Sequence, residues 1–489
     1  MSESGSANVL FVVMDTVRKD RLSVYGHDRE TTPALKRLAE EATTFEEALA
    51  PAPWTLPVHA SMFTGLYPSE HAASQENPYL SGTTTLAESL DRPSACYSSN
   101  AWITPYTGLT AGFSHQDNFF QVMPGGFLSG PLARAWRMMN DSDALRGIAD
   151  RLVAVGNRFH EHFAGSDDAD SKTPHVVDRT IDFIDDNEEY FAFINLMDAH
   201  LPYHPPEEYA AEFAPGVDST EVCQNAKEYN AGVRRIDDAE WEAIHGLYDA
   251  EVRHVDAQLD RLFSWMRKND EWEDTLVIVC ADHGELHGEH GLYGHEFSIY
   301  DELVNVPLIV KHPELPTERR SEQVELLDLY HTILDHAGTE ADPGGEPLDR
   351  TRSLLSPAYR DFENAEQGFV EYYRPVVELN QLESKAVSVG VDLDPESRFY
   401  SRMRAVRRTD AKYIHNERIG DEFYRLDVDP GETENRHGEG DPLEAELSEA
   451  LAAFARRVGS EWGDAPEEDV LSEMDEQTRD RLRDLGYVE

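Results

Sequence analysis

Cysteine is nearly missing from this sequence, with three residues in 489. Cys96, Cys223 and Cys280 lie far apart in the chain, so they form neither the dense pattern of a disulfide framework nor the close pairs of a zinc cluster. The sequence therefore excludes a small disulfide-stapled scaffold. We expect the protein to work in a reducing compartment.

Positive charge is also scarce. Lysine and arginine together number 43, of which eight are lysines, against 95 aspartates and glutamates, so the formal net charge is -52. Such a surface repels nucleic acid and anionic membranes, which excludes a protein that binds phosphate backbones. The acidic residues are spread along the chain, which favours a folded acidic surface over a disordered tail. A halophilic cytosol, where salt screens the repulsion, is the simplest explanation, and ordinary acidic solubility is the alternative.

Long hydrophobic runs are the third absence. No stretch approaches the ~20 apolar residues of a membrane helix. Near the N-terminus, the apolar run 9–13 has no basic segment before it and is too short for a signal peptide, so we interpret it as a buried strand. We therefore expect a soluble, cytoplasmic protein without a membrane span.

Short apolar segments alternate with helical patterns along most of the chain. Strands are predicted at 8–14, 95–97, 190–196 and 276–280, and helices after Thr32-Pro33, at 85–90 and over 238–267. Thr32 is placed to cap the first of these helices, with Pro33 in its first turn. Strands that alternate with helices indicate a doubly wound α/β sheet, whose ligand site lies beyond the carboxyl ends of the strands.

The pattern changes after about residue 360. Two short strands around a turn are predicted within 405–414 and a third at 422–426, followed by helices at 443–457 and 475–484. We therefore predict a catalytic α/β domain over residues 1–360 and a smaller α+β subdomain, 361–489, packed against it. The stretch 105–175 has glycine-rich loops and a helical pattern, and the sequence gives it no role.

Acidic residues follow two of the predicted strands. Asp15 comes directly after the first strand, and Asp282-His283 follows the strand at 276–280. Carboxylates at adjoining strand ends can converge on a divalent cation, and their hard oxygen ligands suit calcium, magnesium or manganese. His283 makes manganese or zinc a further choice. The structural alternative is that Asp15 and Asp282 only stabilise turns.

Thr55 precedes a short helical pattern at 56–63. A threonine in this place is usually a helix cap, which is the structural alternative. The functional interpretation uses the same geometry, because a helix N-terminus and a nearby cation both stabilise an alkoxide and so turn the hydroxyl into a nucleophile.

Histidines cluster near both predicted strand ends. They are His200 and His204 in one segment and His283, His287, His290 and His295 in the other. A solvated loop position is the default for any one of them, since the chain has 20 histidines. A histidine beside a cation and an anionic substrate can steady charge or protonate a leaving oxygen.

Several ordered motifs resemble the sulfatase family within the alkaline-phosphatase superfamily. They are NVLFVVMDTVR at 8–18, LP at 56–57, TGLYP at 64–68, DHGE at 282–285, HGLYG at 290–294, VPLIV at 306–310, YRL at 424–426 before DPGE at 429–432, and LGY at 485–487. The resemblance covers almost the whole chain and is weakest over 105–175. It implies a large mixed sheet flanked by helices, with a smaller C-terminal antiparallel sheet.

The resemblance also implies roles for individual residues. Asp15, Asp282 and His283 would be ligands of one divalent cation, and Thr55 would be the nucleophile. His200 would contact the substrate oxyanion. His295 stands where many members of the family have a lysine.

Two departures from the family pattern bear on the chemistry. The Cys/Ser-x-Pro-x-Arg signature appears as Thr55-Leu56-Pro57-Val58-His59, and Thr16 follows Asp15 where many sulfatases have a second aspartate. A formylglycine needs a cysteine or serine precursor, so we expect none here. We expect His59, together with His200 and His295, to offset charge on the transferred group.

The threonine favours phosphorus over sulfur. A formylglycine hydrate expels sulfate with its second hydroxyl, which threonine lacks, so a threonine ester must be cleaved by water or passed to an acceptor. We therefore favour hydrolysis of a phosphate ester, phosphodiester or phosphonate on a small-molecule, glycan-linked or lipid-linked substrate. The alternatives are a sulfatase that uses unmodified threonine, a phosphotransferase and a degenerate anion-binding protein. A second metal with His200, His204 or His290 as ligands stays open, as does the oligomeric state.

Overall fold

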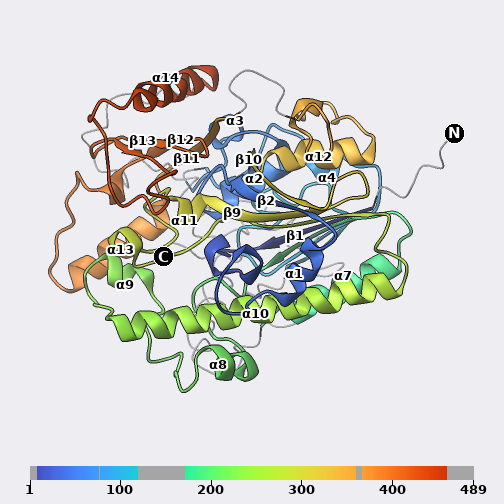
Figure 1. The fold of residues 1–489 in the computed structure, drawn as a ribbon, viewed down its shortest axis with the longest axis horizontal. Coiled ribbons are helices and arrows are strands. Elements are labelled where there is room, and N and C mark those ends of the chain that lie inside the picture. The colour runs from blue at the N-terminus through green and yellow to red at the C-terminus, as the bar shows by residue number, and fades with distance from the viewer. Residues whose placement is uncertain (1–7, 76, 119–170, 360–365, 460–489) are drawn as a thin grey trace, which may run out of the picture.

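An eight-stranded mixed sheet forms the centre of the protein (Figure 1). The computed structural model describes residues 8–75, 77–118, 171–359 and 366–459. In spatial order the strands are β10 (Glu318–Glu325), β2 (Thr43–Leu49), β9 (Asn305–Lys311), β6 (Thr275–Ala281), β1 (Asn8–Met14), β5 (Phe191–Leu196), β3 (Ser94–Ser98) and β4 (His115–Asn118).

The three central strands are buried along their whole length. β1 lies between β6 and β5 and runs parallel to both, and every residue of the three is buried. This explains their continuous apolar sequences, since a parallel strand is covered by helices on both faces. β9 is antiparallel to its two neighbours, which makes the sheet mixed.

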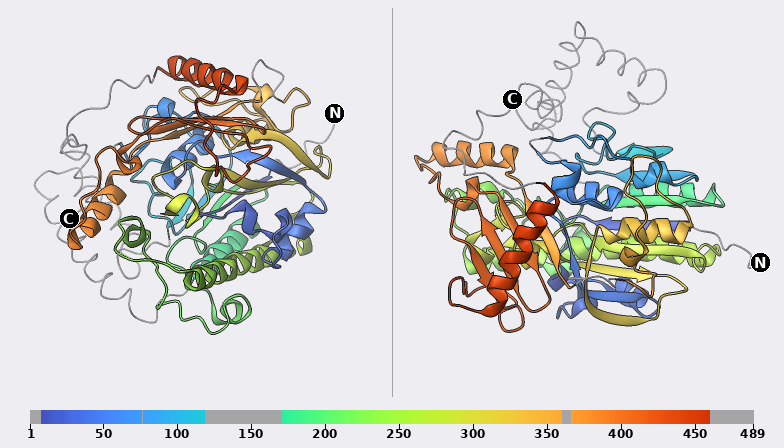
Figure 2. Two further views of the ribbon diagram at one scale, coloured as in Figure 1. Left: turned by 60° about the vertical axis from the view of Figure 1, so that its left-hand side comes forward. Right: turned by 90° about the horizontal axis from the view of Figure 1, so that it is seen from above.

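Helices cover both faces of the sheet (Figures 1 and 2). In one layer the long α10 packs against α1 and α7. In the other layer α2 contacts α3, α4 and α12. The first layer is α1 (Pro33–Ala39), α7 (Thr173–Asp185) and α10 (Asp238–Lys268), and the second is α2 (Thr55–Thr64), α3 (Pro68–His71), α4 (Leu86–Ser89) and α12 (Asp328–Ala337).

A second, antiparallel sheet follows in the C-terminal part. Its strands, in order, are β11 (Gly368–Tyr372), β12 (Met403–Arg407), β13 (Lys412–Asn416) and β14 (Glu422–Tyr424), with α14 (Pro442–Arg457) packed against β12 and β13. The remaining short elements are α8 (Glu207–Phe213), α9 (Ala226–Asn230), β7 (Leu286–His287), β8 (Tyr293–Gly294), α11 (Asp301–Val304) and α13 (Val376–Ser388).

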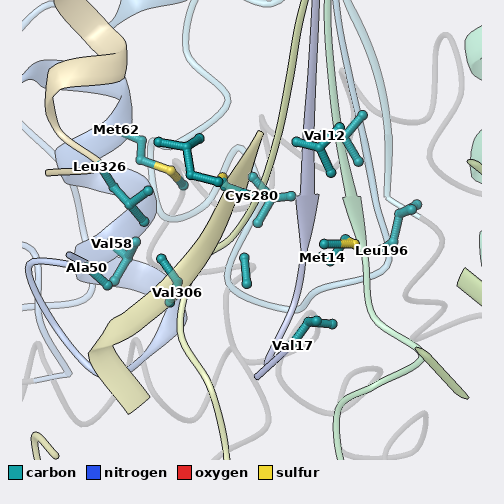
Figure 3. Packing of buried hydrophobic residues seen from close by; sticks show 14 of the residues in the cluster. Val12, Met14, Val17, Ala50, Val58, Met62, Leu196, Cys280, Val306 and Leu326 are labelled. Atoms are coloured by element: carbon teal, nitrogen blue, oxygen red, sulfur yellow. The ribbon is translucent and has the colours of Figure 1, made fainter. Parts of the chain in front are cut away.

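The short helix α2 is held against the sheet by apolar side chains. Val58 and Met62 lie beside Ala50, Val306 and Leu326 in the buried core (Figure 3). Every residue of α2 is buried, so the helix has little freedom to shift. Its N-terminus, where Thr55 stands, is therefore placed by packing rather than by a flexible loop.

The fold predicted from the sequence is confirmed, with one local correction. The predicted strands at 8–14, 95–97, 190–196 and 276–280 are β1, β3, β5 and β6. Thr32 is the N-cap residue of the following helix, with Pro33 in the first turn, but its side chain makes no capping hydrogen bond. The Thr32 hydroxyl accepts from the Val24 amide instead, and Asp256 of α10 accepts hydrogen bonds from the amides of Ala34 and Leu35. A distant carboxylate has replaced the local cap.

Some predictions fall outside the described residues. These are the helix at 475–484, the domain boundary at 360 and most of the stretch 105–175. Among the helices that are described, none combines the length and the apolarity needed to cross a membrane. The cytoplasmic, high-salt setting stays a prediction.

A buried ion cluster joins the two sheets. Lys412 of β13, with no exposed side-chain surface, lies 3.0 Å from both Asp301 Oδ1 and Glu432 Oε1. Arg407 of β12 contacts the other oxygen of Asp301 at 2.7 Å. Asp301 begins the helix that leads into β9, so these charges connect the C-terminal sheet to the central one.

The ion cluster predicts a large cost for removing its lysine. Lys412→Met leaves the buried Glu432 without its lysine, although Asp301 keeps Arg407, and we expect a loss of about 3–5 kcal/mol in the free energy of unfolding. Lys36→Met is the matched control, because Lys36 and its partner Glu30 are exposed, and we expect a loss within about 1 kcal/mol. Urea unfolding measures both values. Equal and small losses would contradict the structural role of the cluster.

Candidate active site

The candidate metal ligands follow two neighbouring strands. Met14 of β1 pairs with Ala281 of β6, so Asp15 and Asp282 leave the sheet side by side. Between them lies Thr16, whose φ of 56° is uncommon for a β-branched residue. This turn directs the Thr16 amide to Asp282 Oδ1, at 3.2 Å. The backbone thus fixes one carboxylate relative to the other.

Two buried oxygens and one ring nitrogen face the same point. Ligand atoms of Asp15, Asp282 and His283 lie within 4.8 Å of one another, and all three residues are fully buried. Asp15 Oδ1 and Asp282 Oδ2 accept no hydrogen bond from any described residue. His283 Nδ1 donates to the Gly284 carbonyl at 3.0 Å, which leaves a lone pair on Nε2. These donors fit a divalent cation.

The pKa shifts of the two carboxylates also fit a bound cation. Burial alone would raise the pKa of Asp15, but the nearby His200 and His283 rings and the hydrogen bond from Asn195 hold it below its ordinary value. Burial and the charge of Asp15 raise the pKa of Asp282 well above its ordinary value. Two carboxyl groups in one buried site cannot both be ionised unless a positive charge compensates them. Burial also lowers the pKa of His283 to about 3, which keeps its ring neutral, as a metal ligand requires.

Thr55 is the first residue of α2, and the helix cap is Trp54. The structural alternative, in which Thr55 caps the helix, is therefore wrong. Its Oγ1 lies 3.5 Å from His283 Nε2, so the hydroxyl borders the group of metal-donor atoms. Thr55 also lines a cavity of about 540 Å³. A hydroxyl held between possible ligand atoms and open space is well placed to act as a nucleophile.

Asn100 is a site residue that the sequence did not predict. Its Nδ2 donates to Asp15 Oδ2 at 2.8 Å and lies 3.3 Å from Thr55 Oγ1. A second amide, Asn195, donates to the same Asp15 oxygen at 3.1 Å. The one available signal was that Asn100 closely follows the predicted strand at 95–97, because the carboxyl ends of parallel strands share one edge of the sheet.

His59 lies one helical turn behind Thr55. Its Nδ1 donates to the Thr55 carbonyl at 2.9 Å and is 3.7 Å from Asp282 Oδ2. The ring is fully buried against Phe63 and Phe193 and does not line the cavity. Burial lowers the pKa of His59 to about 4, so the ring is neutral.

His200 and His295 line the cavity next to the candidate ligands. The His295 ring lies 4.7 Å from that of His283 and 5.2 Å from that of His200. Its Nδ1 contacts Glu285 Oε1 at 3.0 Å. Burial alone would lower the pKa of His295, but Glu285 and the adjacent Glu296 raise it to about 9. The ring is therefore a cation at neutral pH.

His204 and His290 lie elsewhere. His204 contacts Ser219, and His290 stacks on Tyr300 with ring centroids 3.6 Å apart. Neither lines the cavity. The idea that these two histidines add ligands for a second metal is therefore wrong for the described arrangement.

Comparisons with known proteins show the family and the fold of the chain. The sulfatase family profile matches residues 7–339. The multifunctional alkaline phosphatase superfamily protein PehA of Trinickia caryophylli is 24% identical and covers 90% of this chain and 92% of its own length. The phosphonate monoester hydrolase of Agrobacterium radiobacter has a similar structure, with a TM-score of 0.65, 21% identity and coverage of 93% and 96% of the two chains.

A further similar structure holds its substrate D-glucosamine-2-N,6-O-disulfate. It has a TM-score of 0.63 and 17% identity, and covers 94% of this chain and all of its own (100%). The family profile spans most of the chain, from before β1 to the end of α12. The chain therefore belongs to the sulfatase family and is an ester hydrolase.

Proposed function

We propose that the protein hydrolyses a phosphate ester, phosphodiester or phosphonate with Thr55 as its nucleophile. The observation that carries this proposal is the place of Thr55 Oγ1, which borders the cavity 3.5 Å from His283 Nε2. Position 55 offers neither cysteine nor serine, so the aldehyde chemistry of formylglycine has no precursor here.

The reaction has two covalent steps. Thr55 Oγ1 attacks phosphorus, so that an Oγ1–P bond forms while the bond to the leaving oxygen breaks. Water then attacks the same phosphorus, releases the phosphate or phosphonate and restores the hydroxyl, which takes a proton. The proton of the Thr55 hydroxyl passes to the leaving oxygen in the first step, and neither step changes an oxidation state.

The metal group of Asp15, Asp282 and His283 would hold one divalent cation, with calcium, magnesium or manganese favoured and zinc a further choice. A bound divalent cation lowers the pKa of a hydroxyl and offsets charge on the ester. Asn100 holds Asp15 Oδ2 and lies beside the Thr55 hydroxyl, which supports the attacking geometry.

The histidines take separate roles in this proposal. His200 and His295 contact the transferred group, where the positive charge of His295 offsets developing negative charge. His59 acts through Thr55 as a positioning residue, since its ring nitrogen binds the Thr55 carbonyl below the cavity.

Sulfate ester hydrolysis is the second candidate, and the family match favours it. The similar structures act on both kinds of ester. A phosphonate hydrolase and a protein with a sulfated sugar substrate resemble this chain about equally in fold. We favour phosphorus because a threonine ester has no second hydroxyl with which to expel sulfate. A phosphotransferase differs only in the final acceptor, and a degenerate anion-binding protein would carry out neither step.

Metal content tests the proposed ligands. We expect about one divalent cation per chain after dialysis against manganese, and at least a tenfold loss of affinity in Asp282→Asn, because that variant removes a buried anionic ligand. Asp91→Asn is the control, since Asp91 is exposed and outside the cavity. Elemental analysis and calorimetric titration of the chelator-treated protein measure the change. Equal affinities in the two variants would rule out the assigned ligand.

Turnover of matched substrates tests the nucleophile. In high salt with manganese, we expect hydrolysis of 4-nitrophenyl phosphate, its diester or a phenyl phosphonate, and a fall of at least about 10³-fold in kcat for Thr55→Ala. Thr64→Ala is the control, because Thr64 ends the same helix and its hydroxyl binds the Ala60 carbonyl. Turnover of aryl sulfate alone would reverse the preference for phosphorus. Full activity in Thr55→Ala would remove Thr55 from the mechanism.

A further inference from the structure

The cavity above Thr55 extends well beyond the reacting group. Its volume is about 540 Å³, which suits a ligand much larger than a phosphate. Trp54 and Trp102 line one part of it, with ring centroids 5.5 Å apart in an edge-to-face arrangement. Both indoles are almost fully buried, so their orientation is set by packing.

Charged side chains from two other elements line the same cavity. Lys227 comes from α9 and forms an ion pair with Glu296 Oε1, just after β8. Glu378 comes from α13 and accepts a hydrogen bond from Gln75 Nε2. These residues are separate from the proposed metal ligands and from Thr55, and the proposed reaction does not use them.

This part of the cavity is short of positive charge. Among the described residues that line it, Glu285, Glu296 and Glu378 face only two cations, Lys227 and His295. His295 pairs with Glu285 and Lys227 with Glu296. Glu378 accepts a hydrogen bond from the neutral amide of Gln75, and it shares the charge of Lys227 with Glu296. Three carboxylates therefore share two cations.

Glu296 gives a second, independent sign of a missing partner. Its side chain is 6% exposed, and its Oε2 accepts no hydrogen bond from any described residue. A buried carboxylate oxygen without a donor is costly unless a ligand supplies one. Burial and the charge of Glu296 raise the pKa of Glu378 although Lys227 lowers it, as expected where one lysine serves two carboxylates.

We propose that the alcohol part of the ester substrate carries a protonated primary or secondary amine, which binds Glu378 and the free Oε2 of Glu296. The amine supplies both the missing charge and the missing N–H donor. The carbon chain or ring between the amine and the ester oxygen packs against Trp54 and Trp102. This inference rests on the proposed function only in placing the anionic end of the ester at Thr55.

Other ligand classes meet only part of the requirement. A neutral polyol donates hydrogen bonds but leaves the charge of Glu378 unbalanced. A quaternary ammonium supplies charge but has no N–H for Glu296 Oε2. An anionic leaving group would be repelled by the same two carboxylates.

The test is a series of ω-aminoalkyl phosphates with two to six carbons, each compared with the ω-hydroxyalkyl phosphate of equal length. We expect one or more chain lengths to show kcat/KM about ten- to hundredfold higher for the amine, as expected for a charge-assisted hydrogen bond. Glu378→Gln should abolish that preference. Glu383→Gln should retain it, because Glu383 lies on the same helix, binds Tyr400 and does not line the cavity.

A second readout separates this inference from the proposed function. Calorimetric binding of the same phosphates to Thr55→Ala with manganese reports the amine preference without turnover. Hydrolysis of 4-nitrophenyl phosphate, which has no amine, reports the phosphatase activity alone. Equal binding of amine and hydroxyl esters at every length, or a preference that survives in Glu378→Gln, would overturn the amine site even in an active enzyme. Amine preference in binding without any turnover would support the site and overturn the proposed hydrolysis.

Discussion

Two carboxylates meet at the carboxyl edge of the central sheet, and the rest of the site is arranged around their charge. Asp15 and Asp282 are fully buried, and each has one oxygen that accepts no hydrogen bond from the described residues. Their other oxygens are held by amide N–H groups of Thr16, His283, Asn100 and Asn195. Neutral amides can orient two carboxylates but cannot cancel their charge. A divalent cation is the simplest partner that does both.

The same edge of the sheet brings the hydroxyl into place. α2 is buried along its length, so Thr55 is positioned by the core that also supports β1 and β9. Asn100 then links the end of β3 to both Asp15 and Thr55. Thr55 and the candidate ligands therefore share one rigid support, which favours a preorganised site.

The cavity beyond Thr55 combines parts of the chain that are far apart in sequence. Trp54 and Trp102 come from before α2 and after β3, whereas Lys227, Glu296 and Glu378 come from three later segments. The C-terminal part thus contributes α13 to the wall, and the buried ions around Lys412 connect that part to the central sheet. The proposed amine site consequently depends on the position of α13, whereas the proposed chemistry does not.

The sequence by itself determined the positions of β1, β3, β5 and β6, the family and the candidate pair Asp15 and Asp282-His283, because a buried parallel strand has a continuous apolar sequence and the residues after it stand out. It did not predict β10, whose first five residues are mostly exposed and polar, as an edge strand allows. It assigned the side-chain cap of α1 to Thr32, whereas Asp256 binds those amides from another helix. Only the tertiary structure decided these points, along with the roles of Asn100, Lys227 and Glu378. Each depends on contacts between residues distant in the chain, which no local pattern records.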